Sequence, residues 1–308
     1  MQASSEVRRA VVPSLAKVNL DLRVLYRRPD GFHELRTIFQ TISLADKIAI
    51  EYTPAAKTKL SIAGNVDIPD NLILRAADAV MRATKAKGEV HFELDKKIPM
   101  GGGLGGGSSN AAAVLLALPV LLGKKIAAAK LHELAAGLGS DVPFFLYGGT
   151  ALGLGRGTEL YPLADLPPMR GLLAAPQVHV STPDAYRALK REPGGAAPAI
   201  FLNPAAWATE GVNDFEAPVY VQYPELQKLA RRLKRAGAVT VRMSGSGSSI
   251  FSVFSDPAAE AFAMQQLKGI HIHPVTFITR RQYESLWWNC LKRHTLVKEW
   301  PPQSRYEQ

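Results

Sequence analysis

The sequence predicts an α+β fold made of two domains. Its 308 residues are enough for two domains of ordinary size. Strand patterns come first, helical patterns follow and a mixture closes the chain, unlike a strict alternation of strands and helices. A proline-rich stretch over 161–171, YPLADLPPMRG, marks the expected crossing between the domains. We therefore expect a first domain over 1–162, a second over 163–283 and an additional tail over 284–308. An alternative is that the last strand of the second domain returns to the first.

The first half reads as strands followed by helices. Apolar residues alternate from Val18 to Val24, which predicts a strand with Lys17 and Asn19 on one face. A tight turn is expected at 29–31, Pro-Asp-Gly. The other elements expected here are strands over 36–44, 46–52, 58–64 and 90–94, a helix from 70 or 71 to about 88 that begins at a capping residue, and a helix over 127–138.

The second half mixes both kinds of element. Asp141 stands between a small-residue turn and an apolar, strand-like segment. The elements expected after it are a buried strand over 171–180, a helix start at 181–191, a loop at 193–199, an amphipathic helix over 223–236, a strand, glycine turn and strand over 239–255, a helix over 256–269 and a last strand over 270–280.

Composition narrows the class of protein. The single cysteine, Cys290, permits no intrachain disulfide and suits a reducing compartment. The N-terminal residues lack the apolar core of a signal peptide, and no apolar run is long enough to span a membrane. We therefore expect a cytoplasmic protein. The net charge of +10 suits anionic ligands but also nucleic acid. A basic nucleic-acid-binding protein is the non-enzymatic alternative, although the basic residues are scattered and form no stripe with interleaved aromatics.

A glycine-rich stretch over 99–113, PMGGGLGGGSSNAAA, is the strongest local signal. Six glycines fall within 101–107, interrupted only by Leu104. Ser108, Ser109 and Asn110 then supply favoured helix-capping residues before an apolar run. A glycine loop that opens a helix presents free N–H groups and the positive end of the helix dipole to an anion. The stretch therefore predicts a phosphate-binding loop rather than a flexible linker.

Two well-known phosphate motifs do not fit this loop. Gly101, Gly103 and Gly106 satisfy G-x-G-x-x-G, but the preceding strand ends in charges and a proline, and about 100 residues come first. The motif G-x-x-x-x-G-K-[ST] fails because no lysine follows the glycines. Backbone amides would therefore hold the phosphates, and a cation would come from elsewhere in the chain.

Other candidate residues leave alternatives open. Asp141 is either a turn residue or a catalytic carboxylate. Lys17, out of pattern at an apolar strand, is either a snorkelling edge residue or functional. His33 follows a turn, where an exposed residue without a role is expected. The second glycine turn over 244–248 is either a simple hairpin or a second anion-binding nest.

Six segments in order resemble the GHMP kinase superfamily: AKVNLDLRVLYRRPDGFHEL, PDNLILRAA, PMGGGLGGGSSNAAA, GSDVPFF, VNDFE and MSGSGSSIF. The resemblance covers roughly residues 12 to 283. It implies an N-terminal domain like ribosomal protein S5 domain 2, a C-terminal ferredoxin-like α/β sandwich and an active site in the cleft between them. Within the superfamily, KVNL, DGFHEL and GGGLGGGSSNAA resemble the branch that phosphorylates a cytidylyl methylerythritol in non-mevalonate isoprenoid synthesis.

The resemblance implies a role for particular residues. Asp141 would be the catalytic base and Lys17 its cationic partner. Asn71 would lie by the adenosine of ATP, with Lys96 nearby. The residues that would hold the ATP phosphates are Pro99, Met100, Gly101, Gly102, Gly103, Leu104, Gly105, Gly106, Gly107, Ser108 and Ser109.

The substrate residues are assigned in the same way. Asn19 and His33 would bind the substrate, with His33 at the cytosine edge, and Phe32 and Tyr186 would sandwich the cytosine ring. The family commonly has Tyr at the first of these aromatic positions and Phe at the second, so the two are exchanged here. Thr182 and Pro183 would line the same pocket, and the role of Asp214, in VNDFE, stays open.

Phosphoryl transfer needs positioning and charge stabilisation more than covalent chemistry, which fits these residues. Mg²⁺ would bridge the phosphates and keep several waters, and no dedicated set of protein ligands is evident. The rival enzymatic interpretation is another kinase of the superfamily, acting on mevalonate, homoserine or a sugar. We expect a monomer or weak homodimer without nucleic acid or membrane partners. The tail over 284–308 holds Trp287, Trp288 and Trp300, which suit a surface helix packed on the body or a partner contact.

Overall fold

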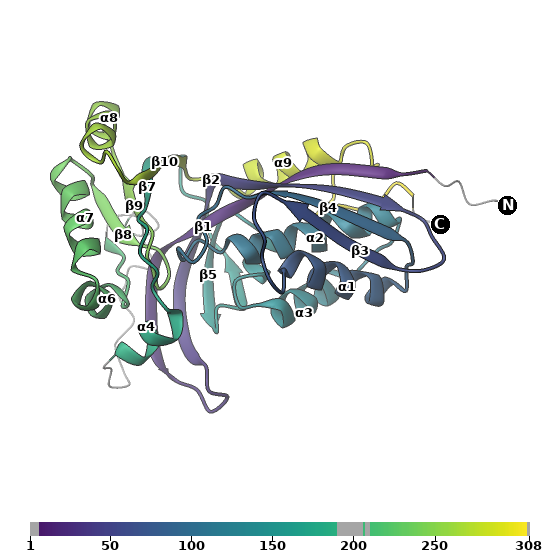
Figure 1. Cartoon of the computed structure of the whole chain (residues 1–308), viewed down its shortest axis with the longest axis horizontal. Helices are drawn as coiled ribbons and strands as arrows, with labels where there is room; N and C mark the ends of the chain where they lie inside the picture. The colour runs from purple at the N-terminus through teal and green to yellow at the C-terminus, as the bar shows by residue number, and fades with distance from the viewer. Residues whose placement is uncertain (1–5, 190–205, 207–209, 307–308) are drawn as a thin grey trace.

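The computed structural model describes residues 6–189, 206 and 210–306, and its first half is a six-stranded sheet covered on one face by helices (Figure 1). Neighbouring strands follow the order β3-β4-β2-β5-β6, and β1 pairs with β2. The strands are β1 (Arg8–Arg27), β2 (His33–Thr53), β3 (Lys59–Gly64), β4 (Glu89–Asp95), β5 (Thr150–Gly155) and β6 (Glu159–Pro162). The covering helices are α1 (Leu72–Thr84), α2 (Gly106–Leu122) and α3 (Ala128–Leu138).

The pair β1 and β2 is a long hairpin that runs along the first sheet and extends beyond it to a tip near α4 (Figure 1). The two separate strands expected over 36–44 and 46–52 are wrong, because β2 is continuous through this region. One half of β2 pairs with β5 and the other with β4, so the sheet supports the whole strand. A register shift in β1 between Leu15 and Lys17 absorbs the local irregularity.

The second half is a four-stranded antiparallel sheet in the order β10-β7-β9-β8. Its strands are β7 (Arg170–Ala175), β8 (Thr240–Met243), β9 (Ile250–Val253) and β10 (His271–Thr276), and its helices are α4 (Thr182–Ala188), α6 (Glu216–Gln222), α7 (Pro224–Arg235) and α8 (Pro257–Gln266). This βαββαβ arrangement is ferredoxin-like. The expected loop over 193–199 lies outside the described residues. The α+β class is confirmed.

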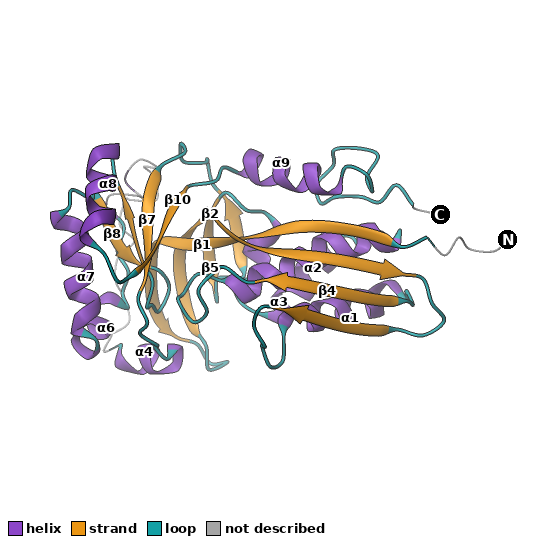
Figure 2. Ribbon diagram, turned by 45° about the horizontal axis from the view of Figure 1, so that its top comes forward, coloured by secondary structure: helices purple, strands orange, loops and turns teal. Residues whose placement is uncertain are grey.

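The two sheets meet through a shared apolar cluster. Val18 and Leu20 from β1 pack there with Leu173 from β7 and Val275 from β10. Ile98 and Leu104, on either side of the first glycines, belong to the same cluster. The glycine-rich loop is therefore anchored where the two sheets join, as the approach of β1 and β2 to β7 in Figure 2 illustrates.

The segment after Asp141 is a short 3-10 helix, η1 (Pro143–Leu146), and the strand-like interpretation is wrong. Pro143 sits in its first turn, where a missing N–H costs nothing. Gly148 and Gly149, both with positive φ, then reverse the chain into β5. The apolar side chains of this turn are buried because they face the first core, the apolar cluster between the first sheet and its helices. They do not belong to a sheet.

The C-terminal residues belong to the first core, although we expected an additional tail from residue 284. Helix α9 (Arg280–Leu291) begins before that point, at a capping box formed by Thr279 and Gln282. Trp287 is fully buried in the first core, and the Trp300 indole N–H donates to the Leu146 carbonyl at 2.9 Å. Strand β10 stays in the second sheet, so the helix, and not the strand, returns to the first half. The expectation of a helix packed on the body is confirmed.

We predict that Trp287→Ala lowers the free energy of unfolding by about 3 kcal/mol, the cost of deleting a large buried aromatic side chain. Chemical denaturation followed by circular dichroism measures the change. Leu286→Ala is the matched control, because its side chain is 38% exposed on the same helix. Equal destabilisation by both variants would show that α9 contributes only its helix and not a buried anchor.

Candidate active site

Lys17 is held in place by an irregularity in β1. The register shift between Leu15 and Lys17 frees the Lys17 backbone N–H from the ladder. That N–H donates to the Leu104 carbonyl of the glycine loop at 3.0 Å. A single strand residue therefore joins the hairpin to the loop and directs its side chain at the space between them.

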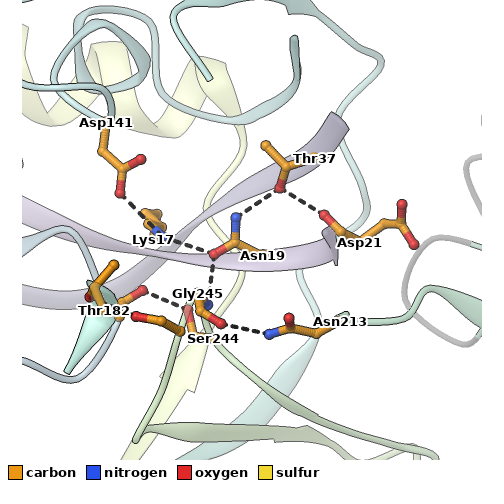
Figure 3. Close-up of polar contacts among 11 residues, drawn as sticks. Lys17, Asn19, Asp21, Thr37, Asp141, Thr182, Asn213, Ser244 and Gly245 are labelled. Carbon is orange, nitrogen blue, oxygen red and sulfur yellow. Dashed lines mark hydrogen bonds and ion pairs between the residues drawn. The ribbon is translucent and has the colours of Figure 1, made fainter. Parts of the chain in front are cut away.

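The Lys17 ammonium lies between an amide and a carboxylate (Figure 3). It donates to Asn19 Oδ1 at 2.8 Å and is 3.3 Å from Asp141 Oδ2. The lysine side chain is only 4% exposed, whereas the Asp141 side chain is 31% exposed. The cation is thus buried behind the carboxylate, and the carboxylate faces the cavity. The structure thus brings together Lys17 and Asp141, the two residues on which the predicted chemistry depends.

Asn19 is fixed from three sides. Its Nδ2 donates to Thr37 Oγ1 at 2.8 Å, and that hydroxyl donates to the Asp21 carbonyl at 2.7 Å. The backbone N–H of Gly245 donates to Asn19 Oδ1 at 3.0 Å. With the amide oxygen already bound to Lys17, the Asn19 side chain has one orientation. It links the first sheet to the second glycine turn (Figure 3).

The second glycine turn, over 244–249, packs directly on the first. The Ser244 hydroxyl donates to the Gly103 carbonyl at 2.9 Å, and a Cβ on Gly103 would overlap the Ser244 carbonyl oxygen. Asn213 Nδ2 donates to the carbonyls of Met243 and Gly245 at 2.8 and 2.7 Å. The hairpin interpretation is confirmed by β8 and β9. Glycine is required here because two backbones approach closely.

Helix α2 begins at Gly106, so the expected capping by Ser108, Ser109 or Asn110 is wrong. Gly105 is the N-cap, in the left-handed region with φ 67°, and no side chain caps the helix. An α-helix leaves its first N–H groups without intrahelical partners. Since no side chain takes them, these groups remain available to an anion, as a phosphate loop requires.

Lys96 lies beside the start of α2, and its ammonium is paired with Asp46. Its ammonium is 2.6 Å from Asp46 Oδ2, and both side chains are buried. Asp46 also accepts from the backbone N–H groups of Lys97 and Ile98 at 2.7 and 2.8 Å, and from Asn110 Nδ2 at 2.9 Å. The pair thus ties the entry and exit of the loop to β2. A nucleotide role for Lys96 stays a prediction.

The other nucleotide residues are dispersed around the loop. Asn71 caps α1, and its side-chain oxygen accepts from the Ile73 N–H at 3.0 Å. Leu104 is buried, whereas Met100 is 62% exposed. None of these positions contradicts a role beside ATP, and their assignment stays a prediction.

A cavity of about 910 Å³ opens in front of Lys17 and Asp141. Predicted residues that line it are Lys17, Asn19, Phe32, His33, Gly103, Gly105, Ser108, Asp141, Thr182, Pro183 and Tyr186. The Thr182 hydroxyl is 2.8 Å from the Ser246 hydroxyl, which joins α4 to the second glycine turn. All the predicted substrate residues therefore share one cavity with three residues of the predicted phosphate loop, Gly103, Gly105 and Ser108.

The aromatic residues are arranged differently from the expected sandwich. The His33 ring stacks on Tyr186 with centroids 4.6 Å apart. Phe32 is half exposed and lies under the Arg156 guanidinium, 4.5 Å from its ring centroid. Phe215 meets Tyr186 edge to face. The sandwich of a base between Phe32 and Tyr186 stays a prediction, and His33 is the ring nearest the Tyr186 face.

Two protonation states follow from this packing. Burial, and then the Asp141 charge, raise the pKa of Tyr186 to about 12, so its hydroxyl keeps its proton and can donate. Burial, and then the Arg27 charge, lower the pKa of His33 below its usual value. His33 is therefore neutral at pH 7 and offers one donor and one acceptor nitrogen.

Several residues of the site were not predicted from the sequence. Arg27, Arg156 and Arg187 line the cavity and make it strongly cationic. Thr37 and Asn213 are hydrogen-bonded to Asn19 and Gly245, and only the fold brings these residues together. Asn213 belongs to the VNDFE segment, in which the sequence pointed only to the neighbouring Asp214. Asp214 itself ties the strand, because it accepts from the Val24 N–H at 2.8 Å.

Within the described residues, no group of three histidine, cysteine or acidic side chains is placed to hold a metal ion. Of the helices in these same ranges, none is both long and apolar enough to cross a bilayer. The fold and site are those of the GHMP kinases: residues 71–149 match the family "GHMP kinases N terminal domain", and residues 196–270 match "GHMP kinases C terminal".

Similar proteins of known name identify the branch of the GHMP kinases to which the chain belongs. A 4-diphosphocytidyl-2-C-methyl-D-erythritol kinase of Solibacter usitatus is 50% identical, over 98% of this chain and 99% of that protein. The enzyme of the same name from Thermus thermophilus is 41% identical, over 80% of this chain and 90% of its own length. A crystal structure of 4-(cytidine 5'-diphospho)-2C-methyl-D-erythritol kinase superimposes with a TM-score of 0.76 at 39% identity, covering 87% of this chain and 98% of that one. The chain belongs to the 4-diphosphocytidyl-2-C-methyl-D-erythritol kinase family.

More distant structures share the fold alone. A homoserine kinase from Cytophaga hutchinsonii gives a TM-score of 0.66 at 20% identity, covering 91% of this chain and 96% of that one. The mevalonate kinase of L. major gives a TM-score of 0.65 at 15% identity, covering 90% of this chain and 98% of that one. Because the Solibacter alignment spans nearly the whole chain, it extends into the residues that we expected to be an additional tail.

Proposed function

We propose that this protein transfers the γ-phosphoryl group of ATP to the 2-hydroxyl of 4-diphosphocytidyl-2-C-methyl-D-erythritol, in the non-mevalonate route to isopentenyl diphosphate. The Lys17–Asp141 pair is the observation that carries the proposal. It stands at 3.3 Å in a cavity that also borders the phosphate loop. Membership of the family supports the same substrate.

ATP would be bound through backbone amides. The free N–H groups at the start of α2 and the helix dipole hold its phosphates. Lys96, and Asn71 at the start of α1, would lie toward the nucleoside. Mg²⁺ fits a site of this chemistry, because Ser108 lines the cavity and could offer it an oxygen, while the phosphates and water would supply the others. When bound, the ion neutralises phosphate charge.

The acceptor hydroxyl is activated by Asp141. Its carboxylate faces the cavity and takes the proton of the substrate hydroxyl as that oxygen attacks the γ-phosphorus. Lys17, buried behind it, offsets the negative charge that builds on the transferred group. Asn19, Thr37 and the Gly245 N–H hold that ammonium in one position, so little reorganisation is needed during the reaction.

The cytidylyl end would occupy the aromatic side of the cavity. Neutral His33 offers a donor and an acceptor to the edge of the base, and Phe32 and Tyr186 offer faces for stacking. Arg156 and Arg187 face the same space and suit the diphosphate of the substrate. The exchange of Phe and Tyr puts a proton-bearing hydroxyl on the Tyr186 side.

The direct test is phosphate transfer from ATP by the purified protein to a panel of alcohols. We expect turnover with the cytidylyl methylerythritol substrate and little with mevalonate, homoserine or sugars. A preference for one of those would favour the rival kinase interpretation. RNA binding without any kinase or ATPase activity would favour the nucleic-acid interpretation of the net charge.

His33→Ala is expected to raise KM for the cytidylyl substrate about tenfold, the loss of a specific hydrogen bond, while KM for ATP changes less than about twofold. Because only neutral His33 offers an acceptor nitrogen and its pKa is lowered, the wild-type KM for that substrate should rise only as the pH falls below the usual titration range of histidine. His132→Ala, on α3, is the control. A similar rise in both KM values would contradict the assigned role.

We further propose that the protein works in the cytoplasm as a monomer or weak homodimer and binds neither nucleic acid nor membrane. Its lone, half-buried cysteine and its anionic substrates support this assignment. Sedimentation analysis with and without RNA tests it, and a stable dimer or an RNA complex would contradict it.

A further inference from the structure

A second cavity of about 430 Å³ borders the first part of the glycine loop. It touches Pro99, Met100 and Gly102, whereas the larger cavity touches Gly103, Gly105 and Ser108. The two cavities have no lining residue in common. The Lys17–Asp141 pair and the predicted substrate residues line the larger cavity, and of the residues that line this one only Pro99, Met100 and Gly102 belong to the predicted phosphate loop.

The edge of the second sheet supplies the basic wall of this cavity. Strands β10 and β7 lie side by side (Figure 2), with His273 opposite Leu173 and His271 opposite Ala175. Alternate residues of a strand share a face, so both histidines are on the side of Val275, which packs between the two sheets. Both therefore point toward the glycine loop and line the cavity.

The lining is rich in basic side chains. His179 and Lys97 complete it beside the two β10 histidines, and no carboxylate side chain is among the described residues that line it. The nearest acidic partner is Asp95, 3.6 Å from the Lys97 ammonium, and both of these side chains are half exposed. Water screens such a pair, so the Lys97 charge still reaches the cavity.

An unsatisfied hydroxyl lies at the inner end. Ser249 lines the cavity and is 1% exposed, and its Oγ has no hydrogen-bond partner among the described residues. Buried polar atoms without a partner are uncommon and call for a ligand or water. The hydroxyl faces Gly102, since a Cβ at that glycine would overlap it. The His179 ring lies against Gly101, with Nδ1 3.3 Å from where a Cβ would be.

We propose that this cavity binds a small phosphate-class anion at a site separate from the ATP and acceptor sites. His271, His273, His179 and Lys97 would supply the positive charge, and the Ser249 hydroxyl a hydrogen bond at the inner end. The shared chemistry is that of inorganic phosphate or diphosphate and of the diphosphate group of a nucleotide or prenyl compound.

The affinity of such a site depends on pH in a defined direction. Burial, and then the charge of His271, lower the pKa of His273 in the free protein. A bound anion favours the protonated rings, so binding takes up protons. Lys97 and His179 face the same space. Affinity should therefore increase as the pH falls from about 8 to about 6, by roughly tenfold, in the range where histidine titrates.

Isothermal titration with inorganic pyrophosphate tests the proposal on protein already saturated with a non-hydrolysable ATP analogue and with the cytidylyl substrate, so that the arginines of the larger cavity are occupied. We expect one site per chain, weakened about tenfold or more at about pH 6 in the double variant His271→Gln, His273→Gln, because two cationic contacts are lost. His132→Gln, a histidine on α3, should leave the affinity unchanged. Parallel titrations with phosphate, ADP and a prenyl diphosphate identify which source binds best.

Two outcomes would overturn the proposal without touching the kinase function. One is that the ATP analogue abolishes pyrophosphate binding, which would place the anion in the phosphate loop itself. The other is that the double variant binds pyrophosphate as the wild type does. The double variant should still phosphorylate the acceptor, so failure of this site and failure of the proposed kinase activity are distinguishable.

Discussion

Asp141→Asn is expected to lower kcat by roughly 10³-fold, because an amide cannot accept the proton of the acceptor hydroxyl and such general-base steps contribute about 10²–10⁴-fold. The substitution keeps the size of the side chain, and its amide oxygen can still accept from Lys17. Steady-state phosphorylation of the cytidylyl substrate measures kcat. KM for ATP and the thermal midpoint should change little, which separates lost chemistry from lost folding.

Asp184→Asn is the matched control for this variant. Asp184 is a carboxylate on α4, near the same cavity, but its side chain is 43% exposed and pairs with Arg187. We expect near wild-type kcat from it. If Asp141→Asn also kept near wild-type turnover, Asp141 would not be the base, and its place beside Lys17 would be structural.

Lys17→Met is expected to lower kcat by roughly 10²–10³-fold, the usual effect of removing one positioned donor or cation that stabilises charge in the transition state. The methionine fills the apolar part of the space, which the Phe39 ring borders 5.5 Å from the ammonium. Asn19 Oδ1 keeps the hydrogen bond from Gly245. The change should therefore appear in kcat more than in KM for either substrate.

The measurement for Lys17→Met pairs single-turnover kinetics with chemical denaturation. Lys130→Met, an exposed lysine on α3, controls for the loss of one positive charge. A large rise in KM for ATP with kcat unchanged would identify Lys17 as a nucleotide-binding group and not as the partner of Asp141. Unfolding at low denaturant would show instead that the buried amine mainly supports the fold.

Much of the local structure could be read from a few neighbouring residues. The turn at 29–31, the start of α1 after Asn71 and the glycine loop depend on backbone sterics and capping within one or two turns of chain. Errors arose where distant packing decided between local options. Gly105, and not a serine, caps α2. The Lys17–Leu104 backbone hydrogen bond places β1 beside this helix end, which no side chain caps. The apolar segment directly after Asp141 forms a 3-10 helix. Its side chains pack into the first core, and its backbone pairs with no described strand.

The Lys17–Asp141 pair shows the same division. Lys17 was conspicuous only as a lysine out of pattern, and Asp141 only as a carboxylate next to aromatics. Their 3.3 Å separation depends on the strand irregularity at Lys17 and on Asn19, which Thr37 and the second glycine turn hold. Asn213 and the three cavity arginines could not be recognised beforehand, because polar residues in loops and strands carry no mark of what they will face.

By itself, then, the sequence determined that this chain has an α+β fold and that a glycine-rich loop opens a helix, and it predicted that this loop binds phosphate with a cation from elsewhere in the chain. Those properties follow from short-range sterics, capping and composition. Only the tertiary structure decided which lysine and which carboxylate meet, which residues hold them, and that β10 presents two histidines to the far end of the same loop. Such contacts join residues far apart in the chain, and only the packing of the two sheets around β1 and β2 brings them together.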